Sequence, residues 1–261
     1  MLGWSNAVPG WLLSVLLIFA FTGLAALGVL LVRSPIQRVF ESEPKRHDLM
    51  TTALRSVVTF YGLLLTLTAA SAYETYAEAR KAVSAEAASL ATLSQAVSDY
   101  PEPTRSELQG LMRDYVDYMT NEAWPAYQQR AAVRGDNDLA ARINGVLHVH
   151  KPESDEEKAQ SRIALAELEK FNENRQLRRS FASTELPGFL WAVLLVGAAF
   201  VVTLTWFLSA QTRRAHLVVS AAIAVIIALL LFVVEAMDGP FEGTMSVSPA
   251  PFEEMRKELV R

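Results

Sequence analysis

The sequence predicts an all-α integral membrane protein with four transmembrane helices and a soluble helical insert between the second and third spans. Three observations support this fold class. Apolar residues, 51% of the chain, gather into four runs, each long enough to cross a hydrocarbon core of about 30 Å. The second run continues without Gly or Pro as far as Tyr100. Residues 80–186, which follow that run, mix polar and apolar positions at helical spacing.

The first predicted span covers residues about 11–32, which carry no charge. A secretory signal peptide would have Lys or Arg before the apolar run and a small-residue cleavage site after it. Residues 1–10 hold no Lys or Arg, and Arg33 ends the run. We therefore expect a retained span, followed by a polar loop over residues 33–52 that contains Pro35 and Pro44.

The second span, residues about 54–76, is expected to leave the membrane without breaking. At 1.5 Å per residue a helix from Leu54 to Val97 would cross the bilayer and extend beyond it by a similar distance. The remaining apolar segments would pack around this helix.

The insert is expected to contain three further helices. An amphipathic helix covers residues 104–124 and is interrupted at Pro125. Residues 135–137 are typical of a polar turn, and a shorter helix is expected over residues 139–150. The last helix is expected over residues 154–183, and its apolar positions recur near helical spacing. These positions are Ile163, Leu165, Leu168, Phe171 and Leu177.

Two further spans follow at residues about 189–210 and 217–236. After Pro251 a short amphipathic helix is expected in the tail. The chain thus divides into four parts: an N-terminal transmembrane hairpin (1–79), the soluble insert (80–186), a C-terminal transmembrane hairpin (187–237) and the tail (238–261).

Composition excludes several classes of function. A net charge of −4 gives no reason to expect a nucleic acid as partner. The absence of cysteine excludes disulfides, thiolate catalysis and Cys-ligated metals. His148 and His150 lie near Glu153 and Asp155, but two histidines two residues apart do not share a helical face, so a solvated helix end is the simpler interpretation. With no phosphate-binding loop or nucleophile motif, we expect no cofactor, no metal and no enzymatic activity.

Charge in the short loops bears on orientation. The loops between spans 1 and 2 and between spans 3 and 4 carry Arg33, Arg38, Lys45, Arg46, Arg213 and Arg214. By the positive-inside rule these loops are cytoplasmic, which places both termini and the insert outside a bacterial inner or plasma membrane. Arg175, Arg178 and Arg179 precede span 3 on the other face and argue against this orientation.

Several short motifs lie along the chain from the second span to the tail. The exit of span 2 carries an aromatic and acidic cluster with Tyr73, Glu74, Tyr76, Glu78 and Arg80. Four further features follow in order. They are Glu86; a Glu-x-Trp-Pro motif at Glu122, Trp124 and Pro125; a Leu-Pro-x-x-x-Trp motif at Leu186, Pro187 and Trp191; and an Asp-x-Pro-Phe-x-Gly motif at Asp238, Pro240, Phe241 and Gly243. Together these motifs resemble the bestrophin-like family of unknown function found in bacteria and plants.

The resemblance implies a ring of identical subunits, a pentamer if the chain is bestrophin-like, that conducts small ions, with anions favoured. Bestrophins gate at an apolar neck on span 2, and the corresponding positions here are Ser56, Phe60 and Leu64. Ser56 departs from the bulky apolar type at this neck, and Leu64 stands in place of an aromatic. Bestrophins also place their insert in the cytosol, which is the alternative to the orientation given by loop charge.

Span 2 also shows a stripe of polar and small residues at helical spacing. The stripe is Arg55, Thr59, Gly62, Thr66, Ala69 and Tyr73. In a bilayer such a face either packs closely on another helix or lines water. Glu74, Glu78, Arg80 and Glu86 would lie at the mouth of a pore, or they form ordinary ion pairs on a solvated face.

At the end of span 4, Glu235 and Asp238 have two interpretations, an ion site or interfacial turn residues. Trp124 is most simply a core residue at a helix break.

Two functional hypotheses follow. The first is a homo-oligomeric ion channel with span 2 facing the axis and lipid, other copies and small ions as partners. The alternative is a membrane-anchored sensor or scaffold whose insert binds a ligand or a partner.

Overall fold

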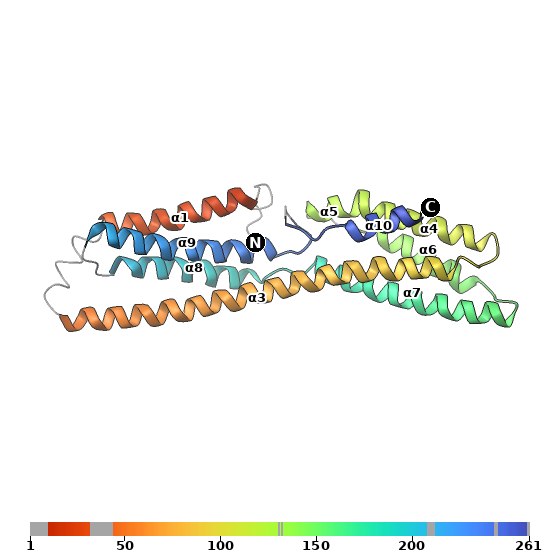
Figure 1. Cartoon of the computed structure of the whole chain (residues 1–261), viewed down its shortest axis with the longest axis horizontal. Helices are drawn as coiled ribbons and strands as arrows, with labels where there is room; N and C mark the ends of the chain where they lie inside the picture. Colours follow the sequence, from red (N-terminus) through yellow and green to blue (C-terminus); the bar gives the residue numbers. More distant parts are fainter. Residues whose placement is uncertain are drawn as a thin grey trace. The chain divides into compact units, whose positions relative to one another are not determined.

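The longest element is α3 (Pro44–Ala96), a single helix of 53 residues. In the computed structural model, residues 10–31, 44–129, 131, 133–207, 212–242 and 245–259 are described, and these residues contain helices and no strands (Figure 1). They form two compact units. Unit 1 comprises Met1–Glu74 and Glu185–Asp238, and unit 2 comprises Thr75–Thr184 and Gly239–Arg261.

α3 begins ten residues before the predicted start of span 2. Residues 44–52 were expected in a loop, but they form its first turns. Proline is favoured in the first turn of a helix, where its missing N–H needs no partner, and no Gly or Pro follows until Gly62. The rest of the predicted loop, residues 32–43, lies outside the described residues. α3 ends before Pro101, as predicted.

Unit 1 is built from the first part of α3 with α1 (Gly10–Leu31), α8 (Gly188–Leu204), the 3₁₀ turn η3 (Thr205–Phe207) and α9 (Arg213–Met237). α1 lies along α9 (Figure 1). Small residues allow close packing of these helices, among them Ala25 on α1 and Ala224 and Ala228 on α9, which are buried. Tyr61 of α3 lies against Gly197 of α8, where a Cβ would overlap its ring.

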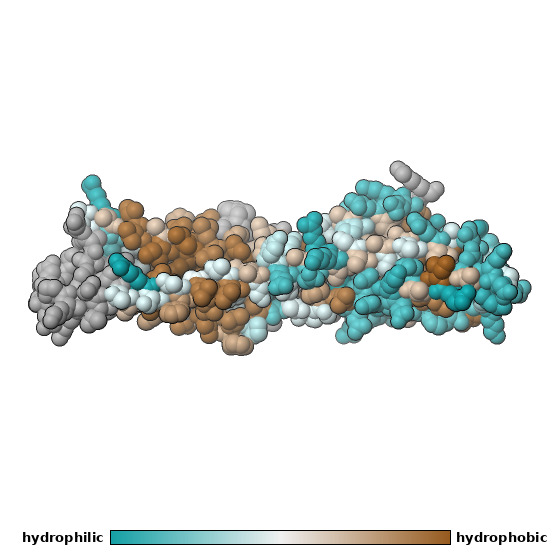
Figure 2. Space-filling model, turned by 60° about the horizontal axis from the view of Figure 1, so that its bottom comes forward, coloured by the Kyte–Doolittle hydropathy of each residue, from teal (hydrophilic) through white to brown (hydrophobic). Residues whose placement is uncertain are grey.

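Within the part of the chain that the structure describes, three helical segments are long and apolar enough to cross a membrane: Thr52–Ala96, Gly188–Phe207 and Arg213–Met237. The apolar part of α1, Val15–Leu31, is shorter, so the first of the four spans stays a prediction. Large side chains such as Phe19 and Val196 are exposed on unit 1, and its surface is largely apolar in Figure 2. Such a surface suits a protein embedded in lipid.

Unit 2 contains the second part of α3 with α4 (Thr104–Tyr118), the π-helix η2 (Met119–Ala123), α5 (Trp124–Gln128), α6 (Gly135–Val149), α7 (Asp155–Ala182) and α10 (Ala250–Leu259). Its core is continuous, and α10 contributes Phe252 and Met255 to it. In the tail, where a short amphipathic helix was expected after Pro251, α10 covers Ala250–Leu259.

A π-helix explains the predicted interruption at Pro125. Proline lacks an N–H, and its ring clashes with the carbonyl group four residues earlier in a regular helix. The wider turn of Met119–Ala123 precedes it and relieves this clash, so the helical path continues into α5. Trp124 is directed into the core by this turn and is buried.

The prediction of a turn at residues 135–137 was wrong. α6 begins at Gly135, and Asp136 and Asp138 occupy its first turn. Acidic side chains there interact favourably with the positive end of the helix dipole. Asp136 in addition has buried ion-pair partners that the sequence alone does not reveal.

α7 forms where predicted. Ser154 caps its start, because the Ser154 hydroxyl accepts a hydrogen bond of 3.1 Å from the backbone N–H of Glu157. Two of its predicted apolar positions, Ile163 and Leu177, are nevertheless exposed.

Candidate functional site

The span-2 part of α3 has two different faces. Five residues are buried on one face, where Tyr61 donates a hydrogen bond of 2.6 Å to the carbonyl of Leu194 on α8. These are Leu54, Tyr61, Leu65, Thr68 and Ala72. Their spacing of three, four or seven residues places them on one side of the helix. The other side makes no comparable contact within the described residues of the chain.

Most of the predicted pore-lining residues lie on that second side. Arg55, Ser56, Thr59, Phe60, Thr66 and Tyr73 are exposed, and Gly62 and Leu64 are half-buried. The Phe60 side chain is 73% exposed. The hydroxyls of Thr59 and Thr66 each donate a hydrogen bond of 2.8 Å to the carbonyl four residues earlier. The chain thus presents an exposed span-2 face that mixes hydroxyl, apolar and guanidinium groups.

The four charged residues predicted at the pore mouth do not share one environment. Glu74, Glu78 and Arg80 are exposed, and Glu78 forms an ion pair of 2.6 Å with Lys81. This pair is the ordinary surface contact that the sequence also allowed. Glu86 is different, because its side chain is fully buried. It therefore has to be removed from the predicted pore-mouth group.

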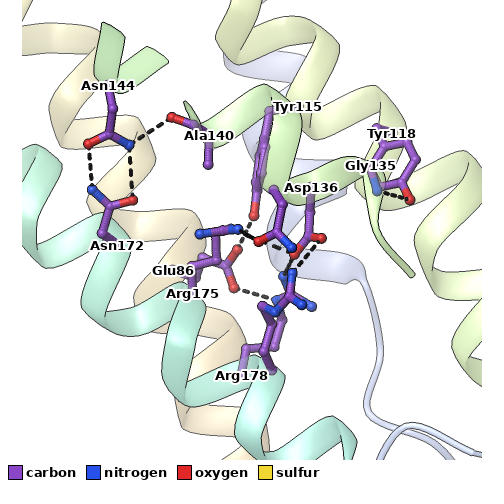
Figure 3. A network of polar contacts seen from close by, with 12 residues as sticks. Glu86, Tyr115, Tyr118, Gly135, Asp136, Ala140, Asn144, Asn172, Arg175 and Arg178 are labelled. Atoms are coloured by element: carbon purple, nitrogen blue, oxygen red, sulfur yellow. Dashed lines mark hydrogen bonds and ion pairs between the residues drawn. The ribbon is translucent and has the colours of Figure 1, made fainter. Parts of the chain in front are cut away.

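Glu86 belongs to a buried charged network in unit 2 (Figure 3). Arg178 of α7 donates from Nε to Glu86 at 2.5 Å, from Nη1 to the Tyr127 hydroxyl at 2.5 Å and from Nη2 to Asp136 at 3.0 Å. The Tyr115 hydroxyl donates to the other oxygen of Glu86. The side chains of Glu86, Asp136 and Arg178 have no exposed surface.

Asp136 receives further positive charge from α7. Arg179 donates to its second oxygen at 2.9 Å, and Arg175 lies 3.6 Å from the first. Two carboxylates therefore meet three guanidinium groups, and the fork of Arg178 joins the two carboxylates. This network connects α3, α6 and α7 inside unit 2.

The pKa values of Arg178, Tyr115 and Tyr127 are shifted in this network. Burial by itself would lower the pKa of Arg178, but the attraction of Glu86 and its hydrogen bond outweigh burial and hold that pKa well above its usual value. Burial, with the charge of Glu86 as the next cause, raises the pKa of Tyr115 well above its usual value. Burial also raises the pKa of Tyr127.

Unit 2 is therefore expected to lose stability in alkali. In the unfolded protein tyrosine has a pKa of about 10. Below that pH Tyr115 is protonated in both the folded and the unfolded protein, so its ionisation does not lower the stability. Above it the unfolded state releases a proton that folded Tyr115 keeps, so stability falls by about 1.4 kcal/mol per pH unit for this tyrosine. Urea unfolding followed by Trp124 fluorescence between pH 8 and pH 11, with the tryptophans of unit 1 replaced by Phe, measures this slope.

Tyr115→Phe is the matched variant. It lowers the stability at pH 8, because Glu86 loses a donor, and it reduces the alkaline slope. Phe171 is a buried neighbour of Tyr115. Phe171→Leu is expected to lower the stability at pH 8 but to leave the slope of stability against pH unchanged. A slope that is the same in wild type and Tyr115→Phe would contradict the assignment.

In unit 1, two of the resembling motifs lie together. The carboxylate of Asp238, at the C-terminal end of α9, accepts a hydrogen bond of 2.7 Å from the backbone N–H of Leu186 and one of 2.8 Å from Nε1 of Trp191. Asp238 thus fastens the end of α9 to the start of α8. Glu235, one turn earlier, is half-buried.

The Asp-x-Pro-Phe-x-Gly motif also meets the Glu-x-Trp-Pro motif, in unit 2. Trp124 packs edge-on against Phe241, with ring centroids 5.7 Å apart, and its Nε1 donates a hydrogen bond of 2.8 Å to the carbonyl of Val247. Glu122 and Pro125 are exposed and Pro240 is buried. Gly243 lies outside the described residues.

No group of three or more potential metal ligands is found among the residues that the structure describes. His148 Nδ1 lies 2.8 Å from the carbonyl of Asn144, one turn earlier on the same helix.

Arg178 and Asp136 were missed at the sequence level. The signal for Arg178 was its position, seven residues after the buried Phe171 and fourteen after the buried Ala164. A charged residue that continues the buried stripe of a helix indicates a buried partner. No comparable signal marked Asp136.

Comparisons with known proteins agree with this architecture. A sequence profile described as Bestrophin-like domain matches residues 13–252. A bacterial bestrophin homolog from Klebsiella pneumoniae has 12% identity and a TM-score of 0.73 over 94% of this chain and 97% of that chain. A point variant of the Klebsiella homolog has 15% identity and a TM-score of 0.70 over 93% and 97% of the two chains.

A structure described as a membrane protein has 13% identity and a TM-score of 0.69, over 95% of this chain and 97% of that chain. At these identities the likeness concerns the fold. A search of the curated proteins finds no match. The profile match covers most of the sequence, and it agrees with the resemblance seen in the motifs: this chain is a membrane protein that belongs to the bestrophin-like family.

Proposed function

We propose that this chain is a subunit of a homo-oligomeric ion channel in which the exposed span-2 face lines the conducting path. The observation that carries the proposal is the division of α3 into a buried and an exposed side. One side is used within the protomer, and the other leaves Arg55, Thr59 and Thr66 exposed within the predicted span.

The chemistry of this face favours water over lipid. A guanidinium group on a transmembrane segment is costly in hydrocarbon, and such groups usually face a protein interior or a water-filled cavity. The Thr59 and Thr66 hydroxyls are satisfied by their own backbone, and each keeps lone pairs that can face water or an ion. Several copies of the chain with this face turned inward would enclose a polar path.

Phe60 is the proposed constriction. Its ring is 73% exposed and lies one turn from Ser56 and from Leu64. Rings of apolar side chains restrict ion flow by dewetting the pore. Arg55, at the start of the predicted span, supplies positive charge to the same path and favours anions.

The test is ion flux through the purified protein in liposomes. Phe60→Ala is expected to raise the flux about tenfold, which corresponds to removing about 1.4 kcal/mol from the barrier. Thr66→Trp is expected to abolish the flux, because an indole replaces a small hydroxyl side chain in the path. Chloride, sodium and potassium are measured separately, with chloride expected to be the most permeant.

Two variants serve as controls on other helices of unit 1. Phe200 is 55% exposed on α8, and Leu229 is 44% exposed on α9. Phe200→Ala and Leu229→Trp change side-chain volume in the same way and are expected to leave the flux unchanged. A folded oligomer that passes none of the three ions would contradict the channel and favour the sensor or scaffold.

A further inference from the structure

Two polar side chains in the first turns of α9 are buried in unit 1. His216 and Ser220, one turn later, are each 1% exposed. Nε2 of His216 lies 2.9 Å from the carbonyl oxygen of Thr205 in η3. A carbonyl oxygen can only accept, so Nε2 carries a proton, and in the neutral tautomer with that proton Nδ1 is an acceptor.

Three polar atoms near this contact have no hydrogen-bond partner in the part of the chain that the structure describes. They are His216 Nδ1, Ser220 Oγ and Trp206 Nε1. Buried polar atoms are nearly always paired, and the need is strongest inside a membrane. Trp206 follows Thr205 directly in η3, and Ser220 lies one helical turn from His216 on the same face of α9.

Ser220 differs from other hydroxyls of the membrane-spanning helices. Several of those donate to the carbonyl four residues earlier on their own helix, which satisfies them locally. They are Ser56, Thr59, Thr66, Thr68 and Thr203. The Ser220 hydroxyl makes no such bond within the described residues. Its proton is therefore available to a partner outside its own helix.

Trp206 closes the site on the side of α1. A Cβ at Gly28 would overlap the indole ring, so the ring lies directly on the backbone of α1. Glycine at this position allows that approach. α1 thus shields the indole and its Nε1 from the surroundings.

We propose that His216, Ser220 and Trp206 form a buried site that binds one water molecule. The indole N–H can only donate, the neutral imidazole Nδ1 can only accept, and the hydroxyl can do both. A water molecule accepts from the Trp206 indole and from the Ser220 hydroxyl and donates to His216 Nδ1, and about three hydrogen bonds are typical of buried water. A cation would face the indole N–H, and an anion would face the lone pair of Nδ1, so neither fits. The water ties the turn after α8 to the start of α9.

The first test is the sign of a stability change in Ser220→Ala. If the hydroxyl holds a water molecule, alanine removes one of its bonds and the Tm of the full-length protein falls by about 2–4 °C. If the hydroxyl is merely buried without a partner, alanine leaves the Tm unchanged or raises it, and the proposal is overturned. Thr203→Val is the control, and its Tm is expected to stay the same because the Thr203 hydroxyl bonds only to its own helix.

The second test observes the site directly. In protein labelled with ¹⁵N-histidine in lipid nanodiscs, the His216 signals are assigned by their loss in His216→Gln. The expected result is the tautomer with the proton on Nε2 and magnetisation transfer from bound water to the ring, weakened in Ser220→Ala. A proton on Nδ1, or a folded protein in which the ring has no water contact, would refute the site.

Discussion

Replacing Arg178 by Met is expected to destabilise unit 2 by about 3–5 kcal/mol, the range for removing one partner of a buried ion pair. The variant leaves the carboxylates of Glu86 and Asp136 buried, and Glu86 keeps only the Tyr115 hydroxyl as a donor among the contacts of its side chain. Hydrogen exchange of the α4 and α6 amides in the full-length protein measures the loss. Where amide exchange requires unfolding of unit 2, its rate should rise by a factor of roughly 10²–10⁴.

Arg178→Lys separates charge from geometry. Lysine keeps the positive charge but presents one compact ammonium group, which cannot replace the three-way fork to Glu86, Tyr127 and Asp136. Its exchange rates should lie between those of wild type and Arg178→Met. Lys158→Met is the surface control on the same helix. It removes an exposed pair with Asp155, and such pairs contribute about 0–1 kcal/mol.

The double variant Glu86→Gln with Arg178→Met decides whether the ion pair is the cause. If the cost of Arg178→Met comes from an uncompensated carboxylate, neutralising Glu86 recovers part of the stability, and the two changes are not additive. Additive losses would show that Arg178 acts through packing alone.

The helical outline of the chain could be read from the sequence, because apolar runs and helical spacing report the faces that each segment buries. The long helix, its end before Pro101 and the capped start of α7 all follow from such local signals. The start of α3 at Pro44 did not, because proline is compatible both with a loop and with the first turn of a helix.

The buried charges were harder to predict, because they depend on residues far apart in the sequence. In α3, Glu86 lies between Val83 and Leu90 in the buried stripe, and in α7 Arg178 continues the stripe of Leu168 and Phe171. The predicted apolar positions of α7 included Ile163 and Leu177, which are exposed. A charged residue in the buried stripe of a helix indicates a buried partner, whereas a further leucine in that stripe does not.

The resembling motifs were found in the sequence, but their grouping was not. Asp238 and Phe241 lie three residues apart in one motif. Asp238 binds Leu186 and Trp191 in unit 1, whereas Phe241 packs on Trp124 in unit 2. Spacing along the chain does not distinguish these partners, since α9 ends at Met237, just before Asp238, and a turn at Gly239, whose φ is +76°, separates Asp238 from Phe241.

Trp124→Ala is expected to release the C-terminal segment from unit 2. Trp124 is 2% exposed and contacts Phe241 and Phe252, which lie on either side of Val247 in the tail. Truncating a buried Trp costs about 3–5 kcal/mol. Because Phe252 belongs to α10, the amides of α10 should then exchange faster than those of α7, which hydrogen exchange of the full-length protein resolves.

Trp124→Phe tests which part of the side chain holds the tail. Phenylalanine keeps a ring in the core but leaves the carbonyl of Val247 without its indole donor, a loss of about 1–3 kcal/mol. If ring packing dominates, α10 stays protected in Trp124→Phe and is exposed only in Trp124→Ala. If both variants leave the exchange of α10 unchanged, the tail is held by other contacts, such as the hydrogen bond of 3.1 Å from Arg113 Nε to the Leu259 carbonyl. The role assigned to Trp124 would then be wrong.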